Sequence, residues 1–225
     1  GGFRHNEQSL RVVDVLEKGG SGLNLTWEVR EGILFHSKVR ESIVAESGGL
    51  ATTLEGQIVR VADSIAYINH DLEDAIRAGV IRESDIPSTV VSKLGTSGVQ
   101  RIKAMVVDIN TNCWPVAEGR LPDPEAPPSL AIRPSRNMLS YIDALREFLF
   151  GRVYLSDFAQ HQAGRATYLI RQLFHYFVAH PTELPGEMAG NPRGEAVERL
   201  VCDHIASMTD RYALRVFREL FSPEG

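Results

Sequence analysis

The stretch Leu54 to Gly79 constrains the fold of this chain more than any other segment. Its apolar residues recur at steps of three or four, which is the spacing that brings side chains to one face of an α-helix. These residues are Ile58, Val61, Ile65, Ile68, Leu72 and Ile76. The pattern predicts one long helix whose apolar stripe faces the core.

The other face of this helix carries Asp63, Tyr67 and Asp71 at i, i+4 and i+8, so a carboxylate, a phenol and a second carboxylate stand above one another. Such a column could hold a metal ion and a hydroxylated ligand. The same residue types also occur on the solvated face of any half-buried helix. Other polar residues of both signs share this half, namely Arg60, His70, Asp74 and Arg77. Periodicity alone leaves both interpretations open.

Three separated blocks carry a resemblance to a known family. They are the string IVRVADSIAY at 58–67, the string FRHNEQS at 3–9 and the string MTDRYA at 208–213. In their order and residues they resemble the deoxyguanosine triphosphate triphosphohydrolase family of the HD superfamily. Because the blocks lie far apart, the resemblance spans nearly the whole chain. It implies an all-α fold, an HD-domain-like helical bundle.

The resemblance also implies roles for particular residues. Members of this family hold a divalent metal, Mg or Mn, with a His, a His-Asp doublet and a later Asp, and Asp63 matches the later Asp. Tyr67 and Asp71 match positions that meet the deoxyribose. His5 matches a histidine of the phosphate pocket and is the candidate catalytic residue, since it could protonate the leaving 5′ oxygen. His36, at the end of a predicted helix, receives no predicted function.

The chain departs from the family in one respect. The family's first His and its His-Asp doublet lie upstream of the FRHN block, and here that block begins at residue 3. We therefore expect the N-terminal HD helices to be missing and the chain to be a fragment. A single aspartate does not retain a catalytic metal, because a divalent site needs several fixed ligands. The isolated 225 residues are expected to be inactive and to bind no metal.

Two functions from different classes remain open. The first is a metal-dependent enzyme that splits a deoxynucleoside triphosphate into deoxynucleoside and tripolyphosphate. The second is a non-catalytic helical module that oligomerises or senses nucleotides, and family members do assemble into homo-oligomers. Binding of single-stranded nucleic acid is disfavoured, because the net charge is −5 and the pI is near 5.8.

Composition sets the remaining limits. A chain of 225 residues with 43% hydrophobic content can bury a sizeable core in a single domain, here 1–225. Cys113 and Cys202 lie too far apart for a CxxC motif, which indicates free thiols and a cytoplasmic protein. No apolar run approaches the roughly 20 residues that span a bilayer, so we expect no membrane association.

Helical patterns cover most of the chain outside the central helix. They span about 5–16, 27–36, 84–95, 99–114, 136–149, 156–177, 195–208 and 209–221. We expect Val29 and Val106 to be buried, Glu31 to face solvent, and Phe158 and Tyr168 to lie in the core. Six of the 11 prolines fall between Pro115 and Pro134, which predicts a proline-rich loop over 115–135.

Overall fold

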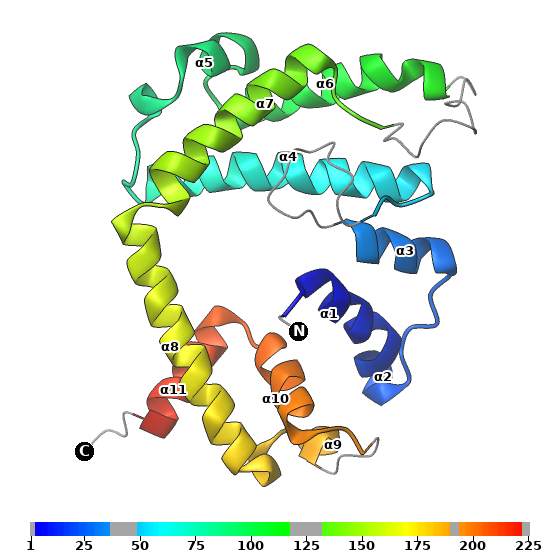
Figure 1. The fold of residues 1–225 in the computed structure, drawn as a ribbon, viewed down its shortest axis with the longest axis vertical. Helices are drawn as coiled ribbons and strands as arrows, with labels where there is room; N and C mark the ends of the chain where they lie inside the picture. Colours follow the sequence, from blue (N-terminus) through cyan, green and yellow to red (C-terminus); the bar gives the residue numbers. More distant parts are fainter. Residues whose placement is uncertain (1–2, 37–48, 118–131, 190–193, 222–225) are drawn as a thin grey trace. The chain divides into compact units, whose positions relative to one another are not determined.

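The computed structural model describes residues 3–36, 49–117, 132–189 and 194–221. Every regular element in these ranges is a helix, and they contain no strand (Figure 1). The predicted all-α class is therefore confirmed. The chain divides into two compact units, Gly1–Leu155 and Ser156–Gly225. The sequence predicts one domain over 1–225, and this stays a prediction.

Within the described residues, the first unit contains seven α-helices and shorter turns. They are α1 (His5–Arg11), a π-helical turn (Val12–Leu16), α2 (Glu17–Gly20), α3 (Trp27–Phe35), α4 (Leu54–Arg77), a 3₁₀ turn (Glu83–Asp85), α5 (Ser88–Leu94), α6 (Gly98–Ala117), α7 (Arg136–Leu149) and a second π-helical turn (Phe150–Tyr154). α4 is the long helix that the apolar stripe predicts. It packs against α3, α6 and α7, and α5 packs on α6 and α7 (Figure 1).

The apolar stripe of α4 forms the centre of this unit's core. Val61, Ile65, Ile68 and Leu72 are each at most 5% exposed, and they pack with apolar residues of α5, α6 and α7. Ile58 is the exception, because 51% of its surface is exposed. None of the described helices covers this first part of α4 on the Ile58 side, so periodicity predicted its burial wrongly.

Burial on α3 differs from the prediction in two residues. Val29 is 48% exposed, whereas Glu31 is 7% exposed. Glu31 is buried because its Oε2 accepts hydrogen bonds from the Thr52 backbone N–H at 3.0 Å and from the Thr52 hydroxyl at 2.9 Å. Two such donors compensate the carboxylate for the hydrogen bonds to water that it loses on burial. The contact ties α3 to the segment that enters α4.

Two glycines let α3 and α4 approach closely. A Cβ placed on Gly56 would lie 2.5 Å from the Ala51 Cβ and 3.4 Å from the Gly32 Cα. A side chain at Gly56 would therefore collide with Ala51 in the segment that enters α4, and it would fill the space up to Gly32 of α3. Thr53 begins α4, since its hydroxyl accepts a hydrogen bond from the Gly56 N–H at 3.2 Å.

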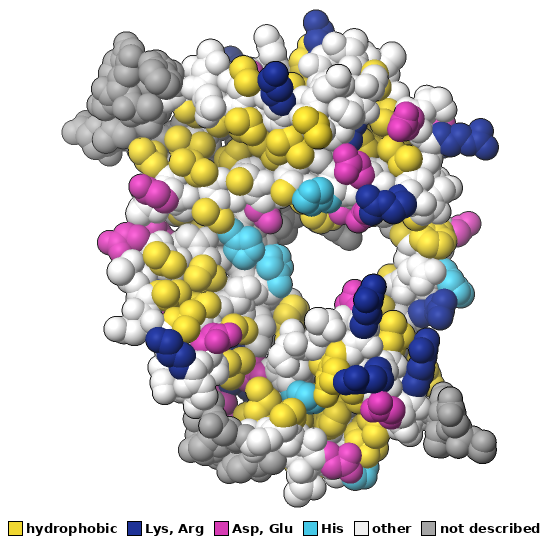
Figure 2. Space-filling model, turned by 180° about the vertical axis from the view of Figure 1, so that it is seen from behind, with side chains coloured by type: hydrophobic (Ala, Val, Ile, Leu, Met, Phe, Trp, Pro, Cys, Tyr) yellow, Lys and Arg dark blue, Asp and Glu magenta, His cyan; other side chains and the backbone are white. Residues whose placement is uncertain are grey.

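α6 is longer than predicted and presents an apolar surface to solvent. It runs to Ala117, so residues 115–117 are helical although Pro115 was expected to lie in a loop. Pro115 has no N–H to donate to the carbonyl four residues earlier, so the last turn of α6 has one backbone hydrogen bond fewer. The rest of the predicted proline-rich loop, 118–131, lies outside the described residues. Val99, Val106 and Val107 are 79%, 43% and 54% exposed, which makes the predicted burial of Val106 wrong. Figure 2 shows hydrophobic side chains gathered over the α6 side of this unit.

The second unit contains α8 (Asp157–Ala179), a 3₁₀ turn (Pro181–Glu183), α9 (Gly186–Ala189), α10 (Val197–Ala206) and α11 (Asp210–Phe221). Its core contains Leu173 and Phe177 of α8 with Leu200 and Val201 of α10. Phe158 and Tyr168 are 52% and 60% exposed, so their predicted burial is wrong. Tyr168 contacts the Phe217 ring of α11, with centroids 6.2 Å apart, but most of its surface stays open to solvent.

In the described part of the chain, no helix is both long enough and apolar enough to cross a membrane.

Candidate functional site along the exposed face of α4

The solvent side of α4 carries the residues that the sequence singles out. Asp63 and Tyr67 are exposed, and Asp71 is half-buried. Their i, i+4 spacing places them along one face of a helix whose other face is held in the core. Burial of the ring is the largest cause that raises the pKa of the Tyr67 hydroxyl, and the negative charges of Asp71 and then Asp63 raise it further.

Tyr154 joins this face from a segment 83 residues further along the chain. Its hydroxyl donates a hydrogen bond to Asp71 Oδ2 at 2.5 Å, and its ring centroid lies 6.1 Å from that of Tyr67. Burial, and then the hydrogen bond to Asp71, raise the pKa of Tyr154 far above its ordinary value. The hydroxyl therefore stays protonated, and the Asp71 carboxylate remains an acceptor with its second oxygen.

A π-helical turn, Phe150–Tyr154, presents Tyr154 at this position. The turn continues α7, whose buried residues Leu145 and Leu149 fix it in the core. Such turns widen a helix by one residue and often occur at functional sites. The sequence does not predict Tyr154 at this site, because no short-range pattern links it to Asp71.

His5 lies at the start of α1, where it meets a second histidine. The ring centroids of His5 and His36 lie 5.3 Å apart in an edge-to-face arrangement. His36 Nδ1 lies 2.6 Å from the Ile33 carbonyl oxygen. Because a carbonyl can only accept, Nδ1 carries the proton and Nε2 is the nitrogen left for another partner. The structure brings His5 to His36, and it records no contact between His5 and the described residues of the Asp63 face.

A pocket of about 670 Å³ lies between α1, α3 and the beginning of α4. It is lined by Ser9, Glu28, Val29, Gly32, Ile33, His36, Thr53, Glu55, Gly56 and Val59. Glu55 and Val59 precede Asp63 by eight and four residues, so they stand on the same face of α4. The pocket therefore opens beside the first turns of the Asp63, Tyr67 and Asp71 column.

Arg60 differs from its predicted place on the polar half of α4. It is 2% exposed, and its Nη1 donates hydrogen bonds to the carbonyls of Gly49 at 3.0 Å and Phe35 at 3.4 Å. Burial lowers the pKa of its guanidinium. Its charged group thus holds α3 and the segment before α4 to the helix that carries the site.

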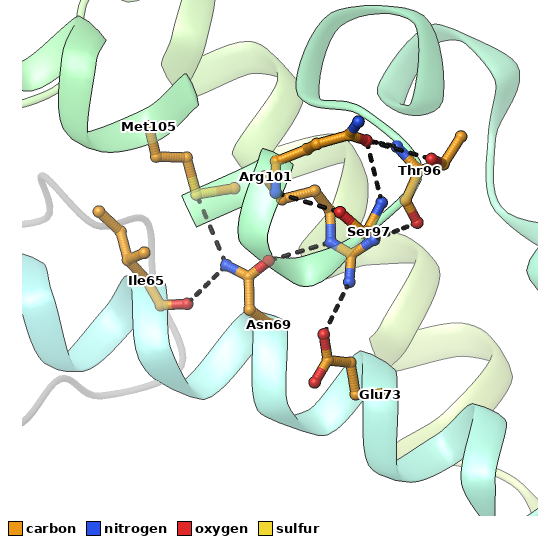
Figure 3. A network of polar contacts seen from close by, with 8 residues as sticks. Ile65, Asn69, Glu73, Thr96, Ser97, Arg101 and Met105 are labelled. Atoms are coloured by element: carbon orange, nitrogen blue, oxygen red, sulfur yellow. Dashed lines mark hydrogen bonds and ion pairs between the residues drawn. The ribbon is translucent and has the colours of Figure 1, made fainter. Parts of the chain in front are cut away.

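A second buried arginine fixes α4 to α6 (Figure 3). Arg101 of α6 is 2% exposed, and its Nε donates to Asn69 Oδ1 at 3.0 Å, while Nη1 donates to the Thr96 carbonyl at 3.0 Å. Its Nη2 lies 3.6 Å from Glu73 Oε1. Asn69 is fully buried and lies between Tyr67 and Asp71 in the sequence, on the opposite side of α4. The network therefore fixes the rotation of α4 about its own axis relative to α6.

The predicted metal ligand is a single carboxylate. Among the described residues, no group of three or more His, Cys, Asp and Glu side chains lies close enough to hold an ion. The described residues therefore do not form a metal site by themselves, and the role of Asp63 stays a prediction. The chain contains one adjacent His-Asp pair, His70 and Asp71 on α4. It follows the FRHN block, whereas the resemblance places the metal-binding doublet before that block.

Known proteins match the chain over its whole length. A sequence profile described as a phosphohydrolase-associated domain matches residues 132–219. A deoxyguanosinetriphosphate triphosphohydrolase-like protein of Caldanaerobacter subterraneus is 42% identical, over 99% of this chain and 59% of that protein. A protein of the same description from Clostridium perfringens is 38% identical, over 100% of this chain and 62% of that protein. Another from Geobacter sulfurreducens is 34% identical, over 99% of this chain and 66% of that protein. The chain belongs to the deoxyguanosine triphosphate triphosphohydrolase family.

Membership in this triphosphohydrolase family confirms the resemblance carried by the three sequence blocks. The phosphohydrolase-associated profile begins before α7 and includes Tyr154, so the segment that supplies the Asp71 partner is itself part of a recognised family domain. The chain spans about three fifths of the length of the first two relatives.

Proposed function

We propose that the protein carrying this chain hydrolyses deoxynucleoside triphosphates, dGTP among them, to deoxynucleoside and tripolyphosphate. The observation that carries the proposal is the exposed face of α4, where Asp63, Tyr67 and Asp71 follow one another and the Tyr154 hydroxyl meets Asp71. The relatives described as triphosphohydrolase-like support the same reaction class.

In this proposal Asp71, Tyr67 and Tyr154 bind the deoxyribose. The Tyr154 hydroxyl occupies Asp71 Oδ2, which leaves Oδ1 to accept a hydrogen bond from the 3′ hydroxyl. The Tyr67 ring packs against the sugar, and a 2′ hydroxyl would meet that ring. Selection of deoxyribose over ribose follows from this steric exclusion.

The phosphate end lies on the Asp63 and His5 side. Asp63 would supply one carboxylate to a divalent metal, Mg or Mn, which when bound would stabilise negative charge on the phosphates. We assign no step to the metal, because the described residues supply only this one ligand. A water oxygen forms a bond to the α-phosphorus as the bond between that phosphorus and the 5′ oxygen breaks, and the proton that the water loses passes to solvent. His5 donates the proton that the departing 5′ oxygen needs.

Product analysis tests the proposal. We expect the protein carrying this chain, given dGTP with Mg or Mn, to release tripolyphosphate and deoxyguanosine in equal amounts. Asp63→Ala should abolish turnover, whereas Asp74→Ala should not, because Asp74 is an exposed carboxylate of the same helix that pairs with Arg77 at 2.7 Å. Release of pyrophosphate or single phosphates would exclude the reaction, and an active Asp63→Ala variant would remove Asp63 from the site.

Assembly into a homo-oligomer and the alternative of a nucleotide-sensing module stay predictions. Sedimentation of the protein with and without deoxynucleoside triphosphates checks both, since a monomer with no response to nucleotide would count against them.

A further inference from the structure

His36 is a polar side chain for which neither the sequence nor the proposed chemistry provides a role. It lies at the C-terminal end of α3, half-buried, and its ring touches that of His5. The Ile33 carbonyl accepts from Nδ1 and so fixes the orientation of the ring. A histidine anchored in this way presents Nε2 to a ligand with little loss of side-chain entropy.

The course of α3 along α4 shows which end of the pocket His36 occupies. Gly32 lies against Gly56, and the Phe35 carbonyl accepts from Arg60, so the two helices run side by side in the same direction. His36 therefore lies beyond the Arg60 level of α4. Asp63, one turn after the pocket residue Val59, is on the same side of the helix. The two histidines thus stand at the Asp63 end of the pocket.

Charge divides the pocket into two ends. Glu28 and Glu55 line it from the first turns of α3 and α4, and their carboxylates repel an anion. His36 and its neighbour His5 stand at the other end, where the imidazolium form of His36 donates Nδ1–H to the Ile33 carbonyl and has Nε2–H to donate to an anion. Adjacent donors of this kind match the oxygens of neighbouring phosphates, and a charged partner strengthens each hydrogen bond.

We propose that His36 is a second phosphate-binding residue, which in its imidazolium form holds the phosphate chain of the substrate through Nε2–H, together with His5. The assignment rests on the proposed function, because it takes the His5 end of the pocket to be the phosphate end. It adds to that function a residue whose side chain touches the substrate and which determines affinity for the triphosphate.

Inorganic tripolyphosphate is the probe, because it carries the phosphate chain without sugar or base. In the protein carrying this chain, we expect its addition to shift the imidazole NMR signals of both His5 and His36. The signals are assigned from His5→Gln and His36→Gln. We expect His36→Gln to weaken tripolyphosphate binding about tenfold or more in calorimetric titration. His161→Gln, an exposed histidine of α8, is the matched control and should bind as the wild type does.

The outcomes separate the two proposals. A His36 signal that stays fixed while tripolyphosphate binds, or a His36→Gln variant with wild-type affinity, overturns the His36 assignment and leaves the hydrolase proposal intact. The same holds for a wild-type protein that turns over dGTP to tripolyphosphate but shows no shift at either histidine. Protein that binds tripolyphosphate through His36 yet releases only pyrophosphate from dGTP supports the assignment and overturns the proposed reaction. The thermal melt of His36→Gln shows whether a loss of binding reflects a loss of fold.

Discussion

At the scale of single residues, the contact between Tyr154 and Asp71 adds the most to what the sequence indicates. The column of Asp63, Tyr67 and Asp71 could be predicted, because helical periodicity is a local property. Tyr154 could not be predicted, since its hydroxyl reaches Asp71 only after α4 and α7 pack together. The same limit applies to His36, whose contact with His5 joins α3 to the beginning of α1.

His204 supplies a prediction for the stability of the second unit. It is 5% exposed and its ring meets the edge of Phe177, with centroids 4.9 Å apart. Burial lowers its pKa, since the charged imidazolium loses water. The unfolded chain therefore takes up a proton near pH 6.5 that the folded chain takes up only at lower pH.

The stability that depends on a neutral His204 is complete above about pH 6.5, and it is lost as the pH falls toward the pKa of His204 in the folded chain. We expect the urea midpoint of the wild type to fall between pH 7.5 and 5.5 by more than that of His204→Gln. His161→Gln should keep the wild-type pH dependence, because His161 is exposed. Equal pH dependence in wild type and His204→Gln would show that His204 is not the source.

At the scale of elements, periodicity predicted the long helices and their order, and tertiary packing decided where it failed. Ile58, Val29 and Val106 sit at helical positions that favour burial, but no described neighbour covers them. Glu31 and Arg60 are buried although the sequence predicts them on polar faces, because specific hydrogen bonds let a charged side chain enter the core. Spacing cannot reveal such partners.

The junction between α4 and α6 gives a prediction at this scale. Asn69→Ala would remove the acceptor that faces Arg101 Nε and leave a guanidinium that is 2% exposed with one partner fewer. We expect a loss of about 2–3 kcal/mol in the free energy of unfolding, because hydrogen bonds to buried charged groups contribute in that range. Asn110→Ala, an exposed asparagine of α6, should change stability by less than about 0.5 kcal/mol.

Chemical denaturation of both variants measures this difference. Equal stability of Asn69→Ala and Asn110→Ala would mean that Asn69 does not hold the two helices. A large effect of Asn69→Ala would confirm that the residue between Tyr67 and Asp71 anchors the site-bearing helix from its buried side.

At the scale of the whole molecule, the chain consists of two helical units, each with its own apolar core. The residues of the proposed site lie in the first unit, Gly1–Leu155. The fold class and the family could both be predicted from the sequence, since the helical spacing and the three motif blocks depend only on the order of the residues. The division into two units was not predicted, because it depends on which helices pack together.

In the proposed function, the exposed face of α4 binds the deoxyribose. The most direct measurement compares kcat/KM for dGTP with that for 2′,3′-dideoxyguanosine triphosphate, in the wild-type protein carrying this chain and in Asp71→Ala. We predict that the wild type prefers dGTP by about tenfold or more, since Asp71 accepts the 3′ hydroxyl. The ratio should fall close to one in Asp71→Ala and stay at the wild-type value in Asp74→Ala. An Asp71→Ala variant that keeps the wild-type preference would show that this face of α4 does not bind the 3′ hydroxyl of the deoxyribose.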